Sequence, residues 1–221
     1  MSLKKLIIFG TGEIAQLANY YFTTDSNFEV VAFTVDRNYI KESSFEKLPL
    51  IAFDELENHF SVKDYFVFIA LSYAQMNNFR EQKYLESKSK GYKIASYISS
   101  KCSYLSQFEP GENAFILEDN TIQPFVKIGT NVTLWSGNHI GHHSIVKDNN
   151  FVSSHVVISG HCVIEKNCFL GVNSTIGHNV MIGEESLIGA GSIITKNTNK
   201  GDVYVPSRSV LLDKKSNTLK L

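Results

Sequence analysis

Histidine is the side chain in this sequence best suited to chemistry near neutral pH, and its distribution is uneven. All seven histidines lie at or after residue 59, and six fall in one stretch: His139, His142, His143, His155, His161 and His178. An imidazole that titrates near neutral pH can accept a proton from an attacking amine or hydroxyl. Isolated surface histidines without a role are common, but this density predicts that at least one is functional.

A repeat of six residues predicts the element that carries these histidines. An aliphatic residue occupies every sixth position from Ile116 to Ile194, and glycine often follows it directly. Neither a helix nor simple strand alternation produces a strict period of six, whereas a repeated short strand and turn does. The fifth position of most hexads is small or slim, as at Ser144 and Cys162. Such repeats are typical of the parallel β-helix.

The repeat also predicts which histidines lie together. Three hexads form one triangular coil, so residues eighteen positions apart are expected to stack on one face. His143 and His161 are one coil apart, and His142 and His178 are two coils apart with a glycine between them. His155 belongs to a different face. None of these histidines occupies an inward position of its hexad, so none is forced into the core.

The first hundred residues predict a different domain. Apolar runs that read as strands cover residues 4–9, 28–35, 49–53, 65–71 and 92–98. Segments with helical spacing lie between them, among them residues 14–22 and 76–89. Strands that alternate with helices imply a parallel sheet in a small Rossmann-like α/β fold. We expect this domain at residues 1–100 and the β-helix domain at 101–221, with residues 99–115 as the connection.

The turn Gly10-Thr11-Gly12-Glu13 follows the first strand and opens a helix. Glycines there let the backbone approach a phosphate, and the amides of a helix N-terminus attract anions. Asp36, at the end of the second strand, could accept hydrogen bonds from a ribose or a base. Ala15 stands where the dinucleotide fingerprint has its third glycine, so binding of a redox dinucleotide is the weaker alternative, and a plain tight turn is another.

Composition excludes several classes of protein. The 221 residues carry a formal net charge of −1, so nothing favours nucleic acid or an anionic membrane as a partner. No apolar stretch is long enough to span a bilayer, and the first residues run into a strand instead of a signal peptide. Cys162 and Cys168 occupy inward positions, where small core residues are expected. We expect a cytoplasmic protein, and no metal-ligand spacing stands out.

A small Rossmann-like domain followed by a hexapeptide β-helix resembles the NeuD-type sugar acyltransferases of the hexapeptide-repeat family. The resemblance spans nearly the whole chain. It implies a left-handed β-helix, a homotrimer with sites between subunits, and acetyl-CoA as co-substrate. It further implies N-acetylation of a dTDP- or UDP-linked 4-amino-4,6-dideoxy sugar in the synthesis of bacterial surface glycans, such as the lipopolysaccharide O-antigen. A sialic-acid type of sugar O-acetyltransferase is an alternative, and a non-catalytic trimer that binds nucleotide sugars is another.

Carried over by position, the resemblance assigns binding residues. It implies that the nucleotide sugar contacts Gly10, Thr11, Gly12, Glu13, Asp36, Arg37, Ser72, Tyr73, Trp135 and Asn138. It implies that acetyl-CoA contacts His155, Gly171, Asn173, Gly189, Ala190 and Arg208. Arg208 belongs to the segment DVYVPSRS, which is similar to the terminal segment of the family. For Trp135, stacking on a sugar or adenine and burial as a packed residue both remain open.

The resemblance also selects a general base. The catalytic histidine of the family follows an aliphatic residue and its neighbour, several residues before a hexad similar to NCFLG. In this chain Ile140-Gly141-His142 precedes that hexad at residues 167–171, which implies His142 as the base. His143 occupies the place where the family often has a glutamate that orients the imidazole.

Overall fold

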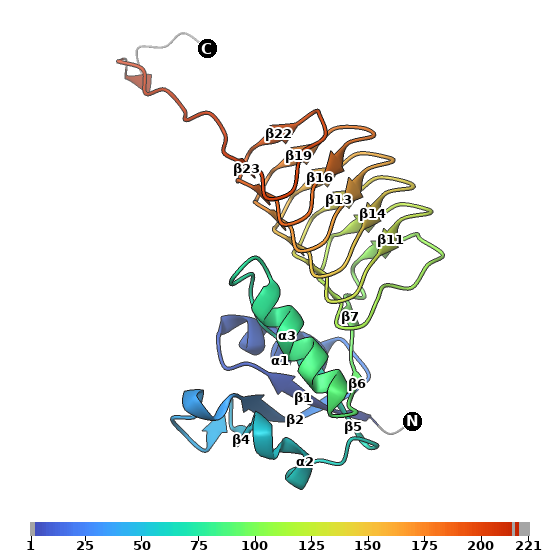
Figure 1. Ribbon diagram of the computed structural model, residues 1–221, viewed down its shortest axis with the longest axis vertical. Helices are drawn as coiled ribbons and strands as arrows, with labels where there is room; N and C mark the ends of the chain where they lie inside the picture. Colours follow the sequence, from blue (N-terminus) through green and yellow to red (C-terminus); the bar gives the residue numbers. More distant parts are fainter. Residues whose placement is uncertain (1–2, 214, 217–221) are drawn as a thin grey trace.

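The computed structural model describes residues 3–213 and 215–216, which form two parts (Figure 1). The N-terminal part is a layered arrangement of strands and helices, and the C-terminal part is a prism of stacked coils. Hydrogen bonds join the two parts directly, so the structure also defines the junction between them. Within the described residues, no helix combines the length and apolar character needed to cross a membrane.

A six-stranded sheet forms the centre of the N-terminal part, in the order β3-β4-β2-β1-β5-β6. Its strands are β1 (Lys4–Phe9), β2 (Phe28–Val35), β3 (Ser44–Phe45), β4 (Leu48–Ala52), β5 (Tyr65–Ile69) and β6 (Lys93–Ile94). All neighbours are parallel except β3, which forms a hairpin with β4. The five parallel strands follow the order 3-2-1-4-5, which is typical of doubly wound α/β sheets.

Helices cover the sheet on both faces, which explains the continuous apolar run of β1. α1 (Glu13–Thr24) buries Ala15, Ala18 and Phe22 in the core on one face. On the other face lie η2 (Phe53–Glu55) and α2 (Leu56–His59), which contribute Phe53 and Leu56. The short helix η1 (Arg37–Tyr39) follows β2.

α3 (Asn78–Ser89) differs from the other helices because its buried side chains are polar. They are Arg80, Lys83 and Ser87. The sequence predicts a helix from residue 76, but Gln75, Met76 and Asn77 have positive φ angles of 54°, 50° and 67°, so the helix begins two residues later.

The boundary between the two parts lies earlier than the sequence predicts. The single strand expected at residues 92–98 is divided into β6, which ends the sheet, and β7 (Tyr97–Ile98), which pairs with β9 of the β-helix. The division follows from the hydrogen bonds, because Ala95 donates to Val67 in the sheet whereas Tyr97 donates to Ala114 in the first coil. Residues 99–115 are therefore part of the β-helix.

The C-terminal part is a parallel β-helix with three sheets of two-residue strands. The first sheet contains β7, β9 (Phe115–Ile116), β12 (Thr133–Leu134), β15 (Phe151–Val152), β18 (Phe169–Leu170), β21 (Leu187–Ile188) and β23 (Val203–Tyr204). The second contains β8 (Ser103–Tyr104), β10 (Thr121–Ile122), β13 (His139–Ile140), β16 (Val157–Ile158), β19 (Thr175–Ile176) and β22 (Ile193–Ile194). The third contains β11 (Lys127–Ile128), β14 (Ile145–Val146), β17 (Val163–Ile164) and β20 (Met181–Ile182).

The predicted inward positions form the core of the prism. Every aliphatic residue of the sixfold series from Ile116 to Ile194 is buried, with at most 5% of its surface exposed. The small residues at the fifth positions are buried too, including Cys162 and Cys168, which are free thiols. The register of the hexads read from the sequence is thus confirmed.

Left-handed backbone conformations mark the three corners of the prism. The asparagine corner consists of Asn113, Asn131, Asn149, Asn167 and Glu185. The histidine corner consists of Phe125, His143, His161 and Asn179, with His142 and His178 beside them. The third corner consists of Asp119, Gly137, His155, Asn173 and Gly191. Asparagine is frequent at such positions because it tolerates positive φ better than most side chains.

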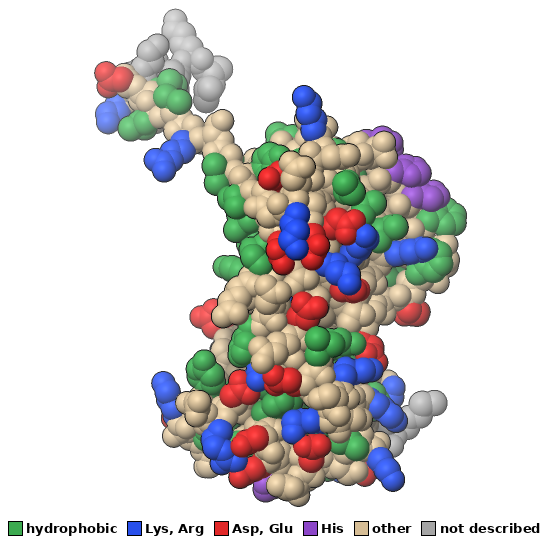
Figure 2. All heavy atoms as spheres, viewed as in Figure 1, with side chains coloured by type: hydrophobic (Ala, Val, Ile, Leu, Met, Phe, Trp, Pro, Cys, Tyr) green, Lys and Arg blue, Asp and Glu red, His purple; other side chains and the backbone are tan. Residues whose placement is uncertain are grey.

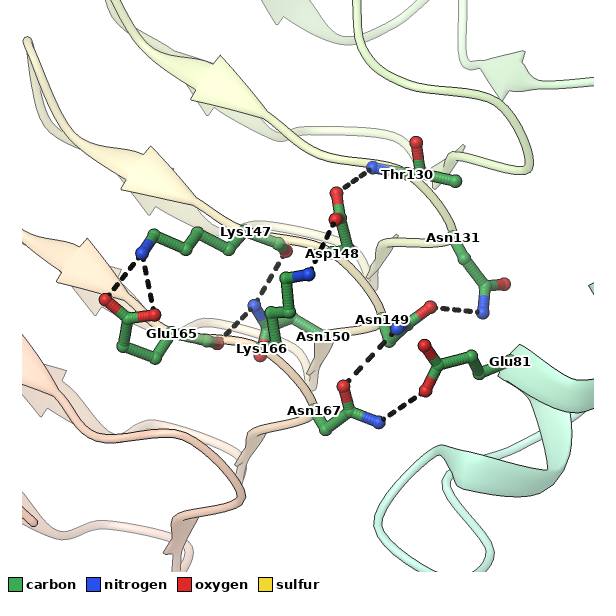
Figure 3. A network of polar contacts seen from close by, with 10 residues as sticks. All are labelled: Glu81, Thr130, Asn131, Lys147, Asp148, Asn149, Asn150, Glu165, Lys166 and Asn167. Carbon is green, nitrogen blue, oxygen red and sulfur yellow. Dashed lines mark hydrogen bonds and ion pairs between the residues drawn. The ribbon is translucent and has the colours of Figure 1, made fainter. Parts of the chain in front are cut away.

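The asparagine corner joins the prism to the N-terminal part. Asn113 Oδ1 accepts a hydrogen bond from the backbone N–H of Ile69 at the end of β5 (2.8 Å). From Asn113 the side-chain amides form a ladder, in which each Nδ2 donates to the Oδ1 of the next coil at 2.7, 2.9 and 3.3 Å. Asn167, the last rung, donates to Glu81 on α3 (3.0 Å), as Figure 3 shows.

Arg80 fastens α3 to the same corner. Its side chain is 1% exposed, and its guanidinium donates to the carbonyls of Asn131, Asn149 and Asn150 at 3.1 to 3.2 Å. It also donates to Asn131 Oδ1 and to the carbonyl of Ser72. Burial lowers the pKa of Arg80 to about 9, so the group is still charged at pH 7.

Candidate active site

The histidine corner brings four imidazoles into one row. His143 and His161 stack with ring centres 4.9 Å apart and an angle of 10° between the planes. His142 stands nearly perpendicular to both rings, at 5.3 and 5.1 Å. His178 meets the edge of His161 at 5.5 Å. The stacking predicted from the spacing of eighteen residues is therefore present, and Figure 2 shows histidines gathered at the edge of the prism away from the N-terminal part.

His142 has a defined position although it is exposed. Its backbone N–H donates to Gln123 Oε1 (2.8 Å), and its Nδ1 lies 3.1 Å from His143 Nδ1. Its ring lies over Gly160, where a Cβ atom would be 2.8 Å from Nε2. Glycine at position 160 therefore provides the space for this ring. The Phe125 ring stacks on the His143 ring with ring centres 4.5 Å apart, and this contact positions His143.

The electrostatics of the row favour the neutral form of His161. The pKa of His161 is lowered by desolvation and then by the positive charges that His143, His142 and His178 carry when they are protonated. A neutral imidazole is the form that accepts a proton or binds a metal. One ligand nitrogen from each of His142, His143 and His161 lies within 4.8 Å of the others, so this group could hold a metal ion. The sequence contained a signal for this cluster, because His143 and His161 are eighteen residues apart and therefore lie on adjacent coils.

The predicted phosphate turn has the backbone that such a site needs. Gly10 has φ +129°, and a Cβ atom there would lie 2.7 Å from the carbonyl oxygen of Ala70. Gly12 is the N-cap of α1 without a capping side chain, and a Cβ atom there would have no described atom within 4 Å. The first amides of α1, next to Thr11 and Glu13, belong to a helix N-terminus, which is a position that attracts anions.

Asp36 and Arg37 are both engaged in ion pairs. Asp36 Oδ1 accepts from Lys83 Nζ at 2.7 Å. Arg37 pairs with Asp54 and Glu55 across exposed surface. These residues line a cavity of about 500 Å³ between η1 and the end of α3. A ligand can reach Asp36 there, since its side chain is 31% exposed.

Ser72 and Tyr73, which follow β5, lie at the junction between the two parts. The Ser72 carbonyl accepts from Arg80, and the Tyr73 ring packs on Phe151 and Phe169 at 5.1 and 4.5 Å. Half of the Tyr73 surface remains exposed. The structure thus gives both residues a packing role, beside the nucleotide-sugar contact that the resemblance implies.

Trp135 and Asn138 do not lie beside His142. Trp135 packs against the core of the N-terminal part and lies 6.3 Å from Phe151, which favours the packed alternative for this residue. Asn138 is 1% exposed, and its side chain bonds the Trp135 carbonyl and the Val156 amide. The predicted contact between Asn138 and the sugar does not fit this position, because a fifth-position side chain points into the prism.

The residues expected to bind acetyl-CoA gather at the third corner, with one exception. His155 and Asn173 are exposed there on successive coils, and Ala190 is exposed on the next. A Cβ atom on Gly171 would lie 2.6 Å from the amide nitrogen of Ala190, and one on Gly189 would lie 2.8 Å from the Tyr204 carbonyl. Both glycines are therefore required by the coil spacing. Arg208 lies apart, exposed in the segment beyond β23.

The structure does not bring the Gly10–Glu13 turn and His142 together within one chain. The N-terminal part contacts the asparagine corner and, through Tyr73, the face that holds β15 and β18. The histidine corner lies between the other two sheets, opposite that face. A ligand bound at the turn of one chain could meet a histidine corner only on a second chain.

Comparison with known proteins agrees with this architecture. Residues 161–196 match the family described as bacterial transferase hexapeptide (six repeats). The acetyltransferase domain of PglB from Neisseria gonorrhoeae FA1090 is 19% identical and has a TM-score of 0.80, covering 90% of this chain and 95% of that one. PerB from Caulobacter crescentus, in complex with CoA and GDP-perosamine, is 16% identical with a TM-score of 0.78, covering 90% and 92%.

A third structure, WeeI from Acinetobacter baumannii AYE, is 17% identical with a TM-score of 0.79, covering 92% of this chain and 97% of that one. A search of curated protein sequences finds no match. At these identities the likeness establishes the fold. The chain carries hexapeptide repeats of the bacterial transferase type, and it shares its two-part architecture with solved acetyltransferases.

Proposed function

We propose that the protein is an acetyl-CoA-dependent N-acetyltransferase that acts on a nucleotide-linked 4-amino-4,6-dideoxy sugar. The observation that carries the proposal is the position of His142, exposed above Gly160 with its Nδ1 fixed 3.1 Å from His143 Nδ1, on a fold shared with sugar acetyltransferases. His142 is exposed, so an incoming amine can approach its ring.

The short contact between the two Nδ1 atoms accommodates one shared proton, and the role of His142 as a base requires that His142 donate it. When His142 Nδ1–H donates to His143 Nδ1, the lone pair on His142 Nε2 is free to act as a base. His143 then carries its own proton on Nε2 and takes the orienting place of the family's glutamate. A neutral imidazole stabilises the resulting imidazolium less than a carboxylate does, because it brings no negative charge.

We propose direct transfer at this site. The amine nitrogen of the sugar attacks the thioester carbonyl carbon, and His142 Nε2 takes the proton that the amine loses. The C–S bond then breaks, and the same proton passes from His142 to the sulfur of CoA. A backbone amide stabilises the oxyanion. No acyl-enzyme is required, and burial raises the pKa values of the Cys162 and Cys168 thiols, that of Cys168 to about 12.

The reaction requires a complex of several chains. We propose a homotrimer of left-handed β-helices, in which the Gly10–Glu13 turn of one subunit presents the nucleotide sugar to the histidine corner of its neighbour. The separation of the turn from His142 within one chain supports this arrangement. Acetyl-CoA would lie along the third corner and the surface next to it, where His155, Asn173 and Ala190 are exposed on successive coils. The free cysteines support a location in the reducing cytoplasm.

Acetyl transfer to defined acceptors tests the proposal. The purified protein is incubated with acetyl-CoA and with dTDP-, UDP- or GDP-linked 4-amino sugars, and free CoA is detected by its thiol. GDP is included because PerB is in complex with GDP-perosamine. The matched control is the same nucleotide sugar with a 4-hydroxyl group. We expect turnover with an amino sugar only; turnover confined to hydroxyl acceptors, or none with any acceptor, would overturn the proposal.

A further inference from the structure

We propose that His142, His143 and His161 form a binding site for one transition-metal dication of the Zn²⁺ type. The proposal rests on three ligand nitrogens that lie within 4.8 Å of one another at the histidine corner. It goes beyond the proposed function because acetyl transfer as described above uses no metal. Only its consequence for activity, described below, rests on that function.

The spacing of the nitrogens is close to that of a metal site. Zn²⁺ binds imidazole nitrogens at about 2.0–2.1 Å in tetrahedral geometry, which places two ligand nitrogens about 3.3 Å apart. His142 Nδ1 and His143 Nδ1 are already 3.1 Å apart. A nitrogen of His161 lies within 4.8 Å of both, and its exposed ring completes the set when it rotates out of the stack with His143. Three protein ligands leave the fourth position open to water or to another group.

Contacts hold the rings of His142 and His143 in place before any metal binds. Phe125, His143 and His161 form one stack, with ring centres 4.5 and 4.9 Å apart. Gly160 lets the His142 ring lie against the coil. Ligands held in position lose less conformational entropy when they bind.

Repetition of the coil explains how the site arises. His143 and His161 occupy the same corner position one coil apart, with φ angles of 59° at both, so their side chains leave the prism in parallel. His142 is the neighbour of His143 and approaches from the side. All three side chains are exposed, so a metal in solvent reaches them directly.

Occupancy of this site would block acetyl transfer. A metal bound to His142 Nδ1 leaves the ring proton on Nε2, so Nε2 no longer offers the lone pair that would take the proton of the amine, and Zn²⁺ becomes a reversible inhibitor. A variant that lacks only His161 keeps the proposed base, His142. Loss of Zn²⁺ inhibition in this variant would show that inhibition depends on the metal site.

Calorimetric titration of the full-length, chelator-treated protein with Zn²⁺ alone tests the site. We expect one ion per chain. His161→Asn should weaken binding by at least about 10–100-fold, the loss seen even when a residue that only supports a ligand is removed. Asparagine suits the positive φ of position 161. The matched control is His155→Asn, at the same left-handed position of the third corner (φ 58°), which should bind Zn²⁺ within about twofold of the wild-type protein.

Two results would overturn the proposal: no saturable binding by the wild-type protein, or equal binding by His161→Asn and the wild-type protein. If the ion binds as expected, acetyl transfer is measured with and without Zn²⁺. Inhibition that a chelator reverses, and that His161→Asn resists, supports both the site and its consequence. Binding at the site without inhibition upholds the metal site and contradicts the role of His142 as the base.

Discussion

Replacement of Arg80 by methionine should loosen the attachment of the N-terminal part to the prism. The guanidinium bonds five acceptors from one fully buried position: Asn131 Oδ1 and the carbonyls of Ser72, Asn131, Asn149 and Asn150. Methionine replaces the aliphatic stem but leaves the carbonyls of Ser72, Asn131 and Asn149 without this donor. Asn131 Oδ1 and the Asn150 carbonyl keep a second donor each, from Asn113 and Thr133.

The magnitude follows from two opposing effects. Four N–H groups that donate from a charged group contribute about 1.5 kcal/mol each, or about 6 kcal/mol together. Removal of a buried cation also relieves a desolvation cost of several kcal/mol, which offsets roughly half of that loss. We therefore expect a net destabilisation of about 3 kcal/mol.

Urea unfolding followed by fluorescence measures this effect at the junction. Trp135 is the single tryptophan and packs against the core of the N-terminal part, so its emission reports on the attachment. With a slope of about 3 kcal/mol per molar urea, the Trp135 transition of Arg80→Met should shift down by about 1 M. Protein concentration is held constant because subunit association also contributes to stability.

The matched control is Arg37→Met. Arg37 also pairs with two acceptors, but its side chain is 54% exposed, and exposed ion pairs contribute little to stability because solvent screens them. Its transition should therefore stay within about 0.3 M of the wild-type value. Equal midpoints for Arg80→Met and the wild-type protein would refute the reasoning, because the buried hydrogen bonds would then contribute nothing beyond the cost of burying the charge.

Three further predictions concern the site. His142→Asn should lower kcat by about 10²–10⁴-fold while calorimetry still shows binding of both substrates, and His143→Ala should cost less; the reverse order would assign the base to His143. Gly10→Ala should destabilise the fold by about 1–3 kcal/mol or more in thermal unfolding, because φ is +129° and the Ala70 carbonyl blocks the Cβ atom. Gly12→Ala should leave stability unchanged and weaken nucleotide-sugar binding; equal stability of the two variants would contradict this. His161 should titrate in NMR below about 6.5, and its pKa should rise in His143→Asn, which removes one repelling neighbour. Because the unfolded chain then binds the proton more tightly, the contribution of His161 to stability is lost as the pH falls from about 6.5 towards the folded pKa; a midpoint at or above 6.5 would disprove the crowding.

The hexad period was enough to predict the prism and the contacts along each corner. Burial of every sixth residue fixes the register, and the stack of His143 on His161 follows directly from it. The same register already indicated that Asn138 points inward, so its assignment to the sugar conflicted with the pattern itself. The period thus predicted correctly which residues stack along the coils of one chain.

Contacts between the two parts could not be predicted in this way. The sequence of α3 is highly charged and reads as an exposed helix, yet Arg80 and Lys83 are buried. Only the pair of Lys83 with Glu86 follows from spacing within the helix. The other partners are Asp36, Asn131 Oδ1 and backbone carbonyls, and no spacing within the helix reveals them. For the same reason the sequence did not show that the N-terminal part covers the face opposite His142.

The amide ladder of the asparagine corner has a direction, and this direction fixes how many coils the protein can have between its two attachment points. The backbone N–H of Ile69 sets the first amide as an acceptor, and the Glu81 carboxylate receives the last donor. Deletion of eighteen residues within the ladder would preserve every hexad, yet the final amide would no longer reach α3. Gain or loss of coils through evolution is therefore expected beyond Asn167, towards the C-terminal end of the prism. The number of coils there is not fixed by the distance between Ile69 and Glu81.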